Sequence, residues 1–222
     1  MLKPLFVFLA LVAGPAAADE TARPLPAPLA DATLTGGASE TAVLAAGCFW
    51  GIQGVFQHVK GVKQVLAGYS GGDAGTAHYQ MVGTETTGHA ESVQIVFDPH
   101  VVSYGQILQV FFSVMDPTTL NYQGPDTGPS YRSEIFAADP AQQRTAEAYI
   151  AQLAKAHAFS GAIVTRISKL HGFYAAEGYH QDYLIHHPDQ PYIVVNDLPK
   201  VDKLHRLYPQ LYREKPVTVA RN

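Results

Sequence analysis

The sequence predicts one α/β (α+β) domain, built as a two-layer sandwich in which helices pack on a mixed or antiparallel sheet in a ferredoxin-like arrangement. The chain has 222 residues, of which 47% are hydrophobic and 15% are charged, which is enough to bury one sizeable core. Segments with strand periodicity and segments with helix periodicity interleave along it. This length and composition need no second domain, so a single domain is expected, and no internal repeat is found.

Strands are predicted where short apolar runs end at turn residues. Val93, Ile95 and Phe97 alternate with more polar neighbours, the period of a half-buried strand, up to an Asp-Pro pair. The other expected strands span residues 41–46, 62–67, 132–137 and 162–167.

Helices are predicted from capping residues and 3.6-residue spacing. Ser103 and Gln106 form a capping box before apolar residues at helical spacing, and this helix should stop at Asp116-Pro117. A second helix should open at Asp139-Pro140 and run toward Phe159. The spacing also indicates a helix over 52–59 and a short amphipathic helix near 201–208 that packs on the body; a partner-binding tail is the alternative for this segment and has no specific support.

The N-terminus has the order of a secretory signal. Lys3 precedes an apolar stretch over residues 5–13, and three alanines precede Asp19. We therefore expect residues 1–18 to be a signal peptide cleaved after Ala18, residues 19–40 to be a flexible lead-in, and residues 41–222 to form the catalytic domain. The protein would then be exported, periplasmic or extracellular, without a membrane span after cleavage; an uncleaved anchor is the weaker alternative.

The charge and the histidines argue against two classes of ligand. A net charge of −4 supplies no positive field for a nucleic-acid backbone, so no nucleic acid is expected. His89 and Glu91 match the His-x-Glu of zinc deaminases, but the paired cysteines of that motif are missing. The histidines of the C-terminal third lack further ligands at a known spacing, so no metal is expected.

Cys48 is the single cysteine, and its surroundings favour a reactive thiol. An odd cysteine in an exported protein cannot form an intrachain disulfide, so it is buried and inert, intermolecular or reactive. Glycines at 47 and 51 bracket Cys48, Phe49 and Trp50, which follow a buried strand and precede a helix. The partial positive charge of a helix N-terminus favours the thiolate, which is the nucleophile.

Six sequence blocks resemble the successive motifs of the peptide methionine sulfoxide reductase A family. In family order they are Gly47–Gly51, Gly68–Gly72, Thr87–Glu91, Asp116-Pro117, Tyr131–Ser133 and Gly178–Leu184. The likeness spans roughly residues 41–212. It implies an enzyme, a peptide-methionine (S)-S-oxide reductase, which reduces methionine S-sulfoxide in proteins, in peptides or free, and repairs oxidised exported proteins.

The resemblance assigns roles to residues at matching positions. The Cys48 thiolate would attack the sulfoxide sulfur and become a sulfenic acid. Glu91 would supply the proton, for which its pKa must be raised by apolar surroundings. The hydroxyls of Tyr79 and Tyr131 would donate hydrogen bonds to the sulfoxide oxygen.

Three further residues complete the site that the resemblance implies. Asp126 matches a further family carboxylate, although its residue type alone is typical of a turn. Phe49 and Trp50 would form the apolar wall around the methyl group of the substrate. His78 and Gln80 flank Tyr79 where members commonly carry threonine or glutamate, which affects the polarity of the subsite.

The chain lacks the recycling cysteines that many members carry. No cofactor is expected to bind, and the reductant would be an external thiol, thioredoxin-like, glutaredoxin-like or small. Two other functions stay open at this point. A cysteine hydrolase would need a histidine beside Cys48, and a non-catalytic peptide-binding module would tolerate Cys48→Ser.

Overall fold

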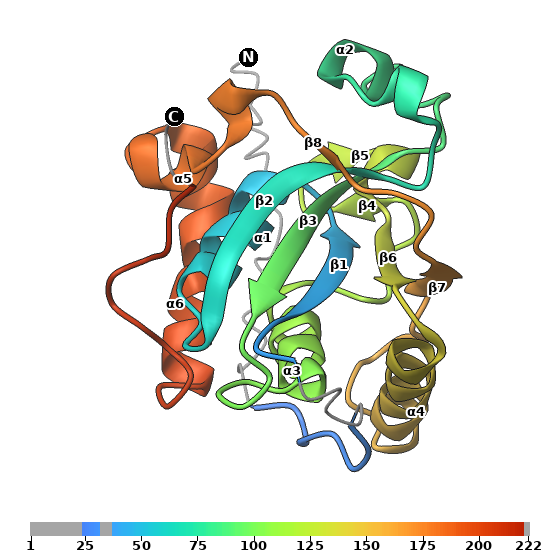
Figure 1. Cartoon of the computed structure of the whole chain (residues 1–222), viewed down its shortest axis with the longest axis vertical. Helices are drawn as coiled ribbons and strands as arrows, with labels where there is room; N and C mark the ends of the chain where they lie inside the picture. The colour runs from blue at the N-terminus through green and yellow to red at the C-terminus, as the bar shows by residue number, and fades with distance from the viewer. Residues whose placement is uncertain (1–23, 32–36, 220–222) are drawn as a thin grey trace, which may run out of the picture.

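The computed structural model describes residues 24–31 and 37–219, so the expected signal peptide lies outside the described residues. A six-stranded sheet in the order β7-β6-β1-β3-β2-β8 forms the centre of the domain (Figure 1). Its strands are β1 (Glu40–Ala46), β2 (Val62–Ser70), β3 (Ala90–Phe97), β6 (Ser133–Ala137), β7 (Arg166–Lys169) and β8 (Tyr174–Ala175). A separate two-stranded ribbon pairs β4 (Tyr122–Gln123) with β5 (Asp126–Thr127).

The order of the four inner strands is that of a ferredoxin-like fold. Strands β6, β1, β3 and β2 pair antiparallel, and the chain visits them in a β-α-β-β-α-β sequence through α1 and α3. Only β7 joins its neighbour β6 in parallel, so the sheet is mixed. The predicted fold class is confirmed.

The helices gather mainly on one face of the sheet, where the main core lies (Figure 1). Helix α1 contacts β2 and β3 as well as α6, and α3 packs between α6 and α4. The helices are α1 (Phe49–Gln57), α2 (Tyr79–Val82), α3 (Tyr104–Val114), α4 (Pro140–Lys155), α5 (Tyr183–His186) and α6 (Leu198–Leu207). The short helical turns are η1 (Ala74–Thr76), η2 (Pro129–Tyr131), η3 (Gly178–His180) and the π-helical η4 (Ile193–Asp197).

The predicted elements exist, with shifted ends. The capping box of α3 is confirmed, since the Ser103 hydroxyl accepts from the Gln106 N–H at 3.2 Å and the Gln106 side chain accepts from the Ser103 N–H. Helix α4 ends four residues before Phe159, because His157 adopts a left-handed backbone conformation. The strand expected over 162–167 instead lies at 166–169, where it pairs with β6.

Part of the expected lead-in lies against the helices. The Leu25 carbonyl accepts from the Gln109 amide of α3 at 2.8 Å, and the Pro26 carbonyl accepts from the Tyr149 hydroxyl of α4 at 2.9 Å. The Asp31 carboxylate accepts from the Gly105 N–H at 2.8 Å. Residues 24–31 are therefore part of the folded body.

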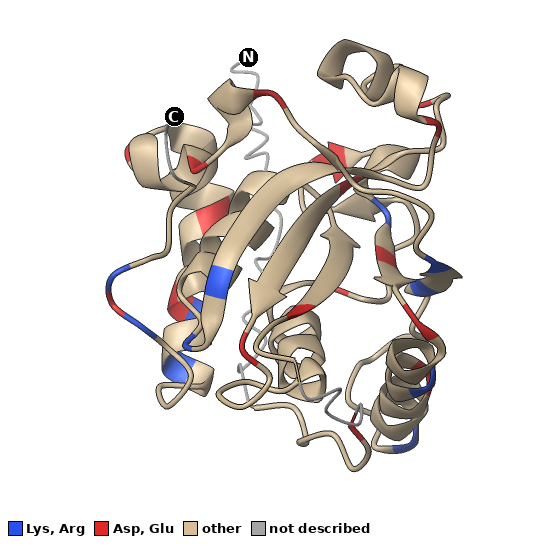
Figure 2. Ribbon diagram, viewed as in Figure 1, with Lys and Arg blue, Asp and Glu red and all other residues tan. Residues whose placement is uncertain are grey.

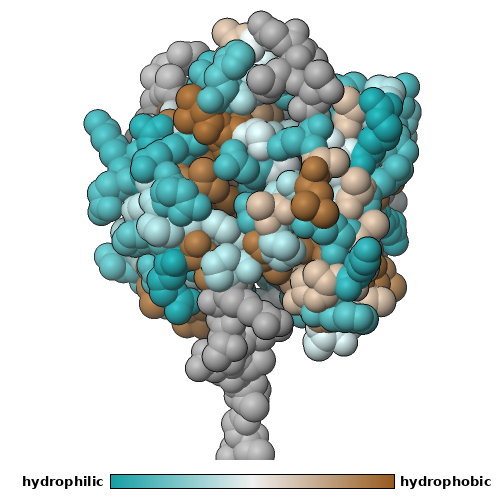
Figure 3. Space-filling view, turned by 90° about the horizontal axis from the view of Figure 1, so that it is seen from below, coloured by the Kyte–Doolittle hydropathy of each residue, from teal (hydrophilic) through white to brown (hydrophobic). Residues whose placement is uncertain are grey.

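The surface of the described residues has mixed polarity. Lys and Arg are spread over several elements rather than gathered in one block (Figure 2). Seen from below, at the end of the sheet away from Cys48, hydrophilic side chains surround smaller hydrophobic patches (Figure 3). None of the helices in residues 24–31 and 37–219 has the length and apolarity that crossing a membrane requires.

Candidate active site

The site forms where the end of β1, the start of β3 and the N-terminus of α1 meet at one edge of the sheet. Gly47 turns the chain from β1 into α1 with a φ of +74°. A Cβ there would lie 2.5 Å from Cβ of Gln123, so both the conformation and the space require glycine. This turn places Cys48 at the N-cap of α1, where the sequence predicted it.

Glu91 lies at the same helix N-terminus as Cys48. Its Oε2 accepts a hydrogen bond from the backbone N–H of Phe49 at 3.0 Å, and the side chain is 4% exposed. Burial raises the pKa of Glu91 to about 8, although the Phe49 N–H opposes this rise. Glu91 is therefore mainly protonated at neutral pH, beside the Cys48 thiol.

Cys48 is a buried thiol, 8% exposed, rather than a ready-made thiolate. Burial raises the pKa of Cys48, and the carboxylates of Glu91 and Asp197 raise it further, while the N–H of Trp50 and the ammonium of Lys200 lower it. The helix N-terminus favours the thiolate through the Trp50 N–H, but desolvation by burial outweighs it, so the pKa of Cys48 is raised overall. Protonation of Glu91 removes one of the two opposing charges.

Two tyrosine hydroxyls and one carboxylate surround this pair. Tyr79 begins α2 and Tyr131 ends η2; burial raises the pKa of both, and ionisation of Glu91 or Cys48 would raise it further. Both tyrosines are therefore neutral hydrogen-bond donors at neutral pH. Asp126 lies in β5 and accepts a short hydrogen bond from the Tyr192 hydroxyl.

The two expected apolar residues have different surroundings. Phe49 is 1% exposed and packs against Tyr69 and His180. Trp50 is partly exposed, stacks on Tyr183 with ring centroids 3.9 Å apart, and donates from Nε1 to Nδ1 of His180 at 3.2 Å. The Trp50 indole is thus held in place from one side, as a wall of the site requires.

The structure therefore brings all seven predicted site residues to one edge of the sheet. It also adds three residues that sequence reasoning missed: Tyr192, which bonds Asp126, and the buried pair Asp197 and Lys200. The segment that carries these residues shows no local motif. The one signal in the sequence is Asp197, a carboxylate shortly after the apolar run 193–195.

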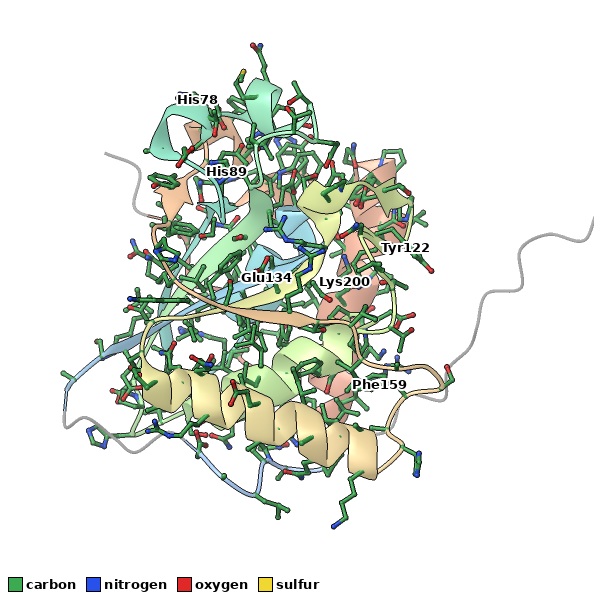
Figure 4. The ribbon with its side chains drawn as sticks, turned by 90° about the vertical axis from the view of Figure 1, so that its right-hand side faces the viewer. His78, His89, Tyr122, Glu134, Phe159 and Lys200 are labelled. Atoms are coloured by element: carbon green, nitrogen blue, oxygen red, sulfur yellow. The ribbon has the colours of Figure 1, made fainter. Side chains whose placement is uncertain are left out.

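Arg132 connects the two segments that carry Tyr131 and Glu91. Its guanidinium donates to the carbonyls of Gly88 at 3.0 Å, His89 at 3.2 Å and Pro129 at 2.8 Å, and to the carboxylate of Glu134 at 2.6 Å. Figure 4 labels His89, in the turn just before β3, and Glu134, in β6. Arg132 thus fixes the turn before β3 relative to η2.

No candidate metal centre is found in the described residues. Within 24–31 and 37–219, no group of three or more His, Cys, Asp or Glu side chains is placed to hold a metal ion.

Comparisons with known proteins agree with this arrangement. The family model for peptide methionine sulfoxide reductase matches residues 40–211. The peptide methionine sulfoxide reductase MsrA 2 of Mesorhizobium japonicum is 58% identical over 182 residues, which is 82% of this chain and 93% of that protein. The protein of the same name from Synechocystis is 46% identical, over 90% of this chain and 95% of its own length.

Solved structures show the same fold. The reduced form of Mxr1 from Saccharomyces cerevisiae superposes with a TM-score of 0.63 at 30% identity, over 72% of this chain and 91% of that one. Methionine sulfoxide reductase A of Corynebacterium diphtheriae gives a TM-score of 0.61 at 32% identity, over 78% and 92% of the two chains. A buried thiol beside a protonated carboxyl on this fold is the site of a thiol oxidoreductase. The chain belongs to the peptide methionine sulfoxide reductase A family, as a member with one cysteine.

Proposed function

We propose that this enzyme reduces the S epimer of methionine sulfoxide through a sulfenic acid on Cys48. The observation that carries the proposal is the hydrogen bond from the Phe49 N–H to Glu91, which puts a carboxyl with a pKa of about 8 beside the only thiol of the chain. The family relationship supplies the substrate class. The epimer rests on the family relationship alone.

The reductive step balances with these two groups. The Cys48 sulfur forms a bond to the sulfoxide sulfur as Glu91 protonates the sulfoxide oxygen, and the thiol proton returns to the Glu91 carboxylate. The oxygen is then transferred to the Cys48 sulfur, as the sulfur–oxygen bond of the substrate and the new sulfur–sulfur bond both break, and methionine leaves. The substrate is reduced by two electrons, and the thiol is oxidised to a sulfenic acid.

The phenols support this step by stabilising charge. As the sulfur–oxygen bond lengthens, negative charge grows on the oxygen, and the neutral hydroxyls of Tyr79 and Tyr131 can donate to it. Phe49 and Trp50 would enclose the methyl group, and Asp126, oriented by Tyr192, would lie beside the phenols.

Recycling must use an external thiol, because the chain contains no second cysteine. A thioredoxin-like, glutaredoxin-like or small thiol would attack the sulfenic sulfur, release water and leave a mixed disulfide on Cys48. A second thiol would then release the Cys48 thiol and carry away the disulfide. We further propose that the enzyme is exported through a signal cleaved after Ala18 and repairs oxidised exported proteins; an intact mass that begins at Asp19 tests the cleavage.

Two experiments test the chemistry. Separated epimers with a small dithiol should give turnover of the S epimer only, and equal rates or preference for the R epimer would remove the assignment. Excess substrate without reductant should give about one methionine per enzyme and one added oxygen on Cys48, without loss of two hydrogens. A yield well above one without thiol, or an unmodified Cys48 after product has formed, would refute the mechanism.

The hydrolase alternative lacks its base. In the described part of the chain, no hydrogen bond joins Cys48 to a histidine, and the nearby His180 accepts from Trp50 through Nδ1. Acyl-enzyme formation with an ester would be the observation in its favour.

A further inference from the structure

A buried ion pair lies against the helix that carries Cys48 at its N-terminus. Asp197, which is fully buried at the end of η4, bonds the ammonium of Lys200 at 2.9 Å. A Cβ on Gly51 would lie 2.2 Å from Oδ1 of Asp197 and 3.0 Å from Nζ of Lys200. The pair therefore packs directly on the bare backbone of Gly51, and any side chain there would displace it.

Gly51 places this pair in the first turn of α1, three residues after the N-cap residue Cys48. The Cα–Cβ direction of Gly51 tilts toward the helix N-terminus, where Cys48 lies. Asp197 also has an oxygen, Oδ2, that is buried and accepts no hydrogen bond from the described residues. A buried ion pair with an unsatisfied oxygen is costly, so packing alone gives no reason for it.

We propose that Asp197 and Lys200 are positioning residues that control the charge on the Cys48 sulfur, with opposite signs. Burial is the main cause that keeps Cys48 protonated at rest; Asp197 adds to it by opposing the thiolate, while Lys200 supplies a cation that favours the thiolate when Glu91 is neutral. This rests on the proposed function, in which the Cys48 sulfur is the nucleophile.

The ionisable groups around Cys48 come from several elements. They are Glu91 of β3, Asp197 of η4, Lys200 of α6, Tyr79 of α2, Tyr131 of η2 and Tyr192 before η4. Lys200 is the cation of this set. It lies near the start of α6, as labelled in Figure 4.

The test is the pH dependence of Cys48 alkylation by iodoacetamide, which needs no sulfoxide and so succeeds or fails independently of the proposed activity. Asp197→Asn should lower the apparent pKa of the thiol by about one unit, and Lys200→Gln should raise it by about one unit. The double variant should lie between them. Both single changes break the same ion pair, so a purely structural role predicts shifts in one direction.

Lys203→Gln is the matched control, because it removes the same charge from the same helix without contact with Gly51; it should shift the pKa by less than about 0.3 unit. Emission from Trp50, the single tryptophan, reports whether the site itself has opened. If Lys200→Gln does not fold, Asp197→Asn should still show a lower pKa than the double variant, since only the former keeps Lys200. Shifts of the same sign in both single variants, no shift in either, or an equal shift in the control would overturn the proposal.

Discussion

Replacing Glu91 by glutamine should slow the enzyme and stabilise it at the same time. Glu91→Gln keeps the size of the side chain and an oxygen that can accept from the Phe49 N–H, but it removes the proton that the carboxyl transfers. General acid catalysis is usually worth about 10²–10⁴-fold in rate. We expect a loss of this size in the single-turnover formation of methionine, with substrate binding changed much less.

The stability gain follows from the raised pKa. A carboxyl with a pKa of about 8 in the folded state and 4.5 when unfolded contributes its full stability below pH 4.5 and loses it as the pH rises toward 8. At about 1.4 kcal/mol per pKa unit, the loss is about 3 kcal/mol at pH 7 and about 5 kcal/mol above pH 8. Glutamine does not titrate, so the variant avoids this loss.

Urea unfolding of both proteins from pH 5 to pH 8 measures the difference. The advantage of Glu91→Gln should grow with pH, while Glu147→Gln on the exposed face of α4 should show no such trend. A rate loss under about tenfold would show that the acid lies elsewhere. A stability difference that is constant with pH would show that the Glu91 pKa is not raised.

Three further substitutions test the supports of the site. Tyr192→Phe removes the hydrogen bond to Asp126 and should lower kcat/KM by about 10- to 100-fold, because a hydrogen bond to a carboxylate is worth roughly 1.5–3 kcal/mol. Arg132→Met leaves a buried carboxylate unpaired and should cost about 3–5 kcal/mol in urea unfolding, whereas Arg144→Met, on the surface of α4, should stay within about 0.5 kcal/mol. Ser103→Ala removes the capping box of α3 and should cost about 1 kcal/mol, again by urea unfolding, with activity unchanged.

The fold and the position of Cys48 could be predicted from short stretches of sequence, because both depend on short-range constraints. The capping box of α3 and the alternation in β3 are visible in a few residues, and Gly47 reflects a positive φ that the turn into α1 needs. The end of α4 was missed because no residue before the Ser160-Gly161 pair signals the left-handed His157. The strand at 166–169 was shifted because its ends are set by pairing with β6, which is a long-range contact.

The same reasoning explains which site residues could be found. Cys48 and Glu91 lie in segments with glycine turns, whereas Asp197 of η4 and Lys200 of α6 reach the site from more than 100 positions further along the chain. Nothing in an isolated Asp-x-x-Lys distinguishes a buried pair from an ordinary exposed pair on a helix. The contact with Gly51 distinguishes this buried pair from an exposed one, and that contact exists only in the folded chain.

The raised pKa values of Cys48 and Glu91 have a common cause that links them. Both groups are buried at one helix N-terminus, and a negative charge on Glu91 opposes the ionisation of Cys48. Ionisation of Glu91 therefore favours the protonated form of Cys48. A sulfoxide oxygen that takes the proton from Glu91 leaves the carboxylate able to accept the thiol proton. The burial that makes Cys48 a poor thiolate at rest is thus the same burial that keeps a proton available for the sulfoxide oxygen.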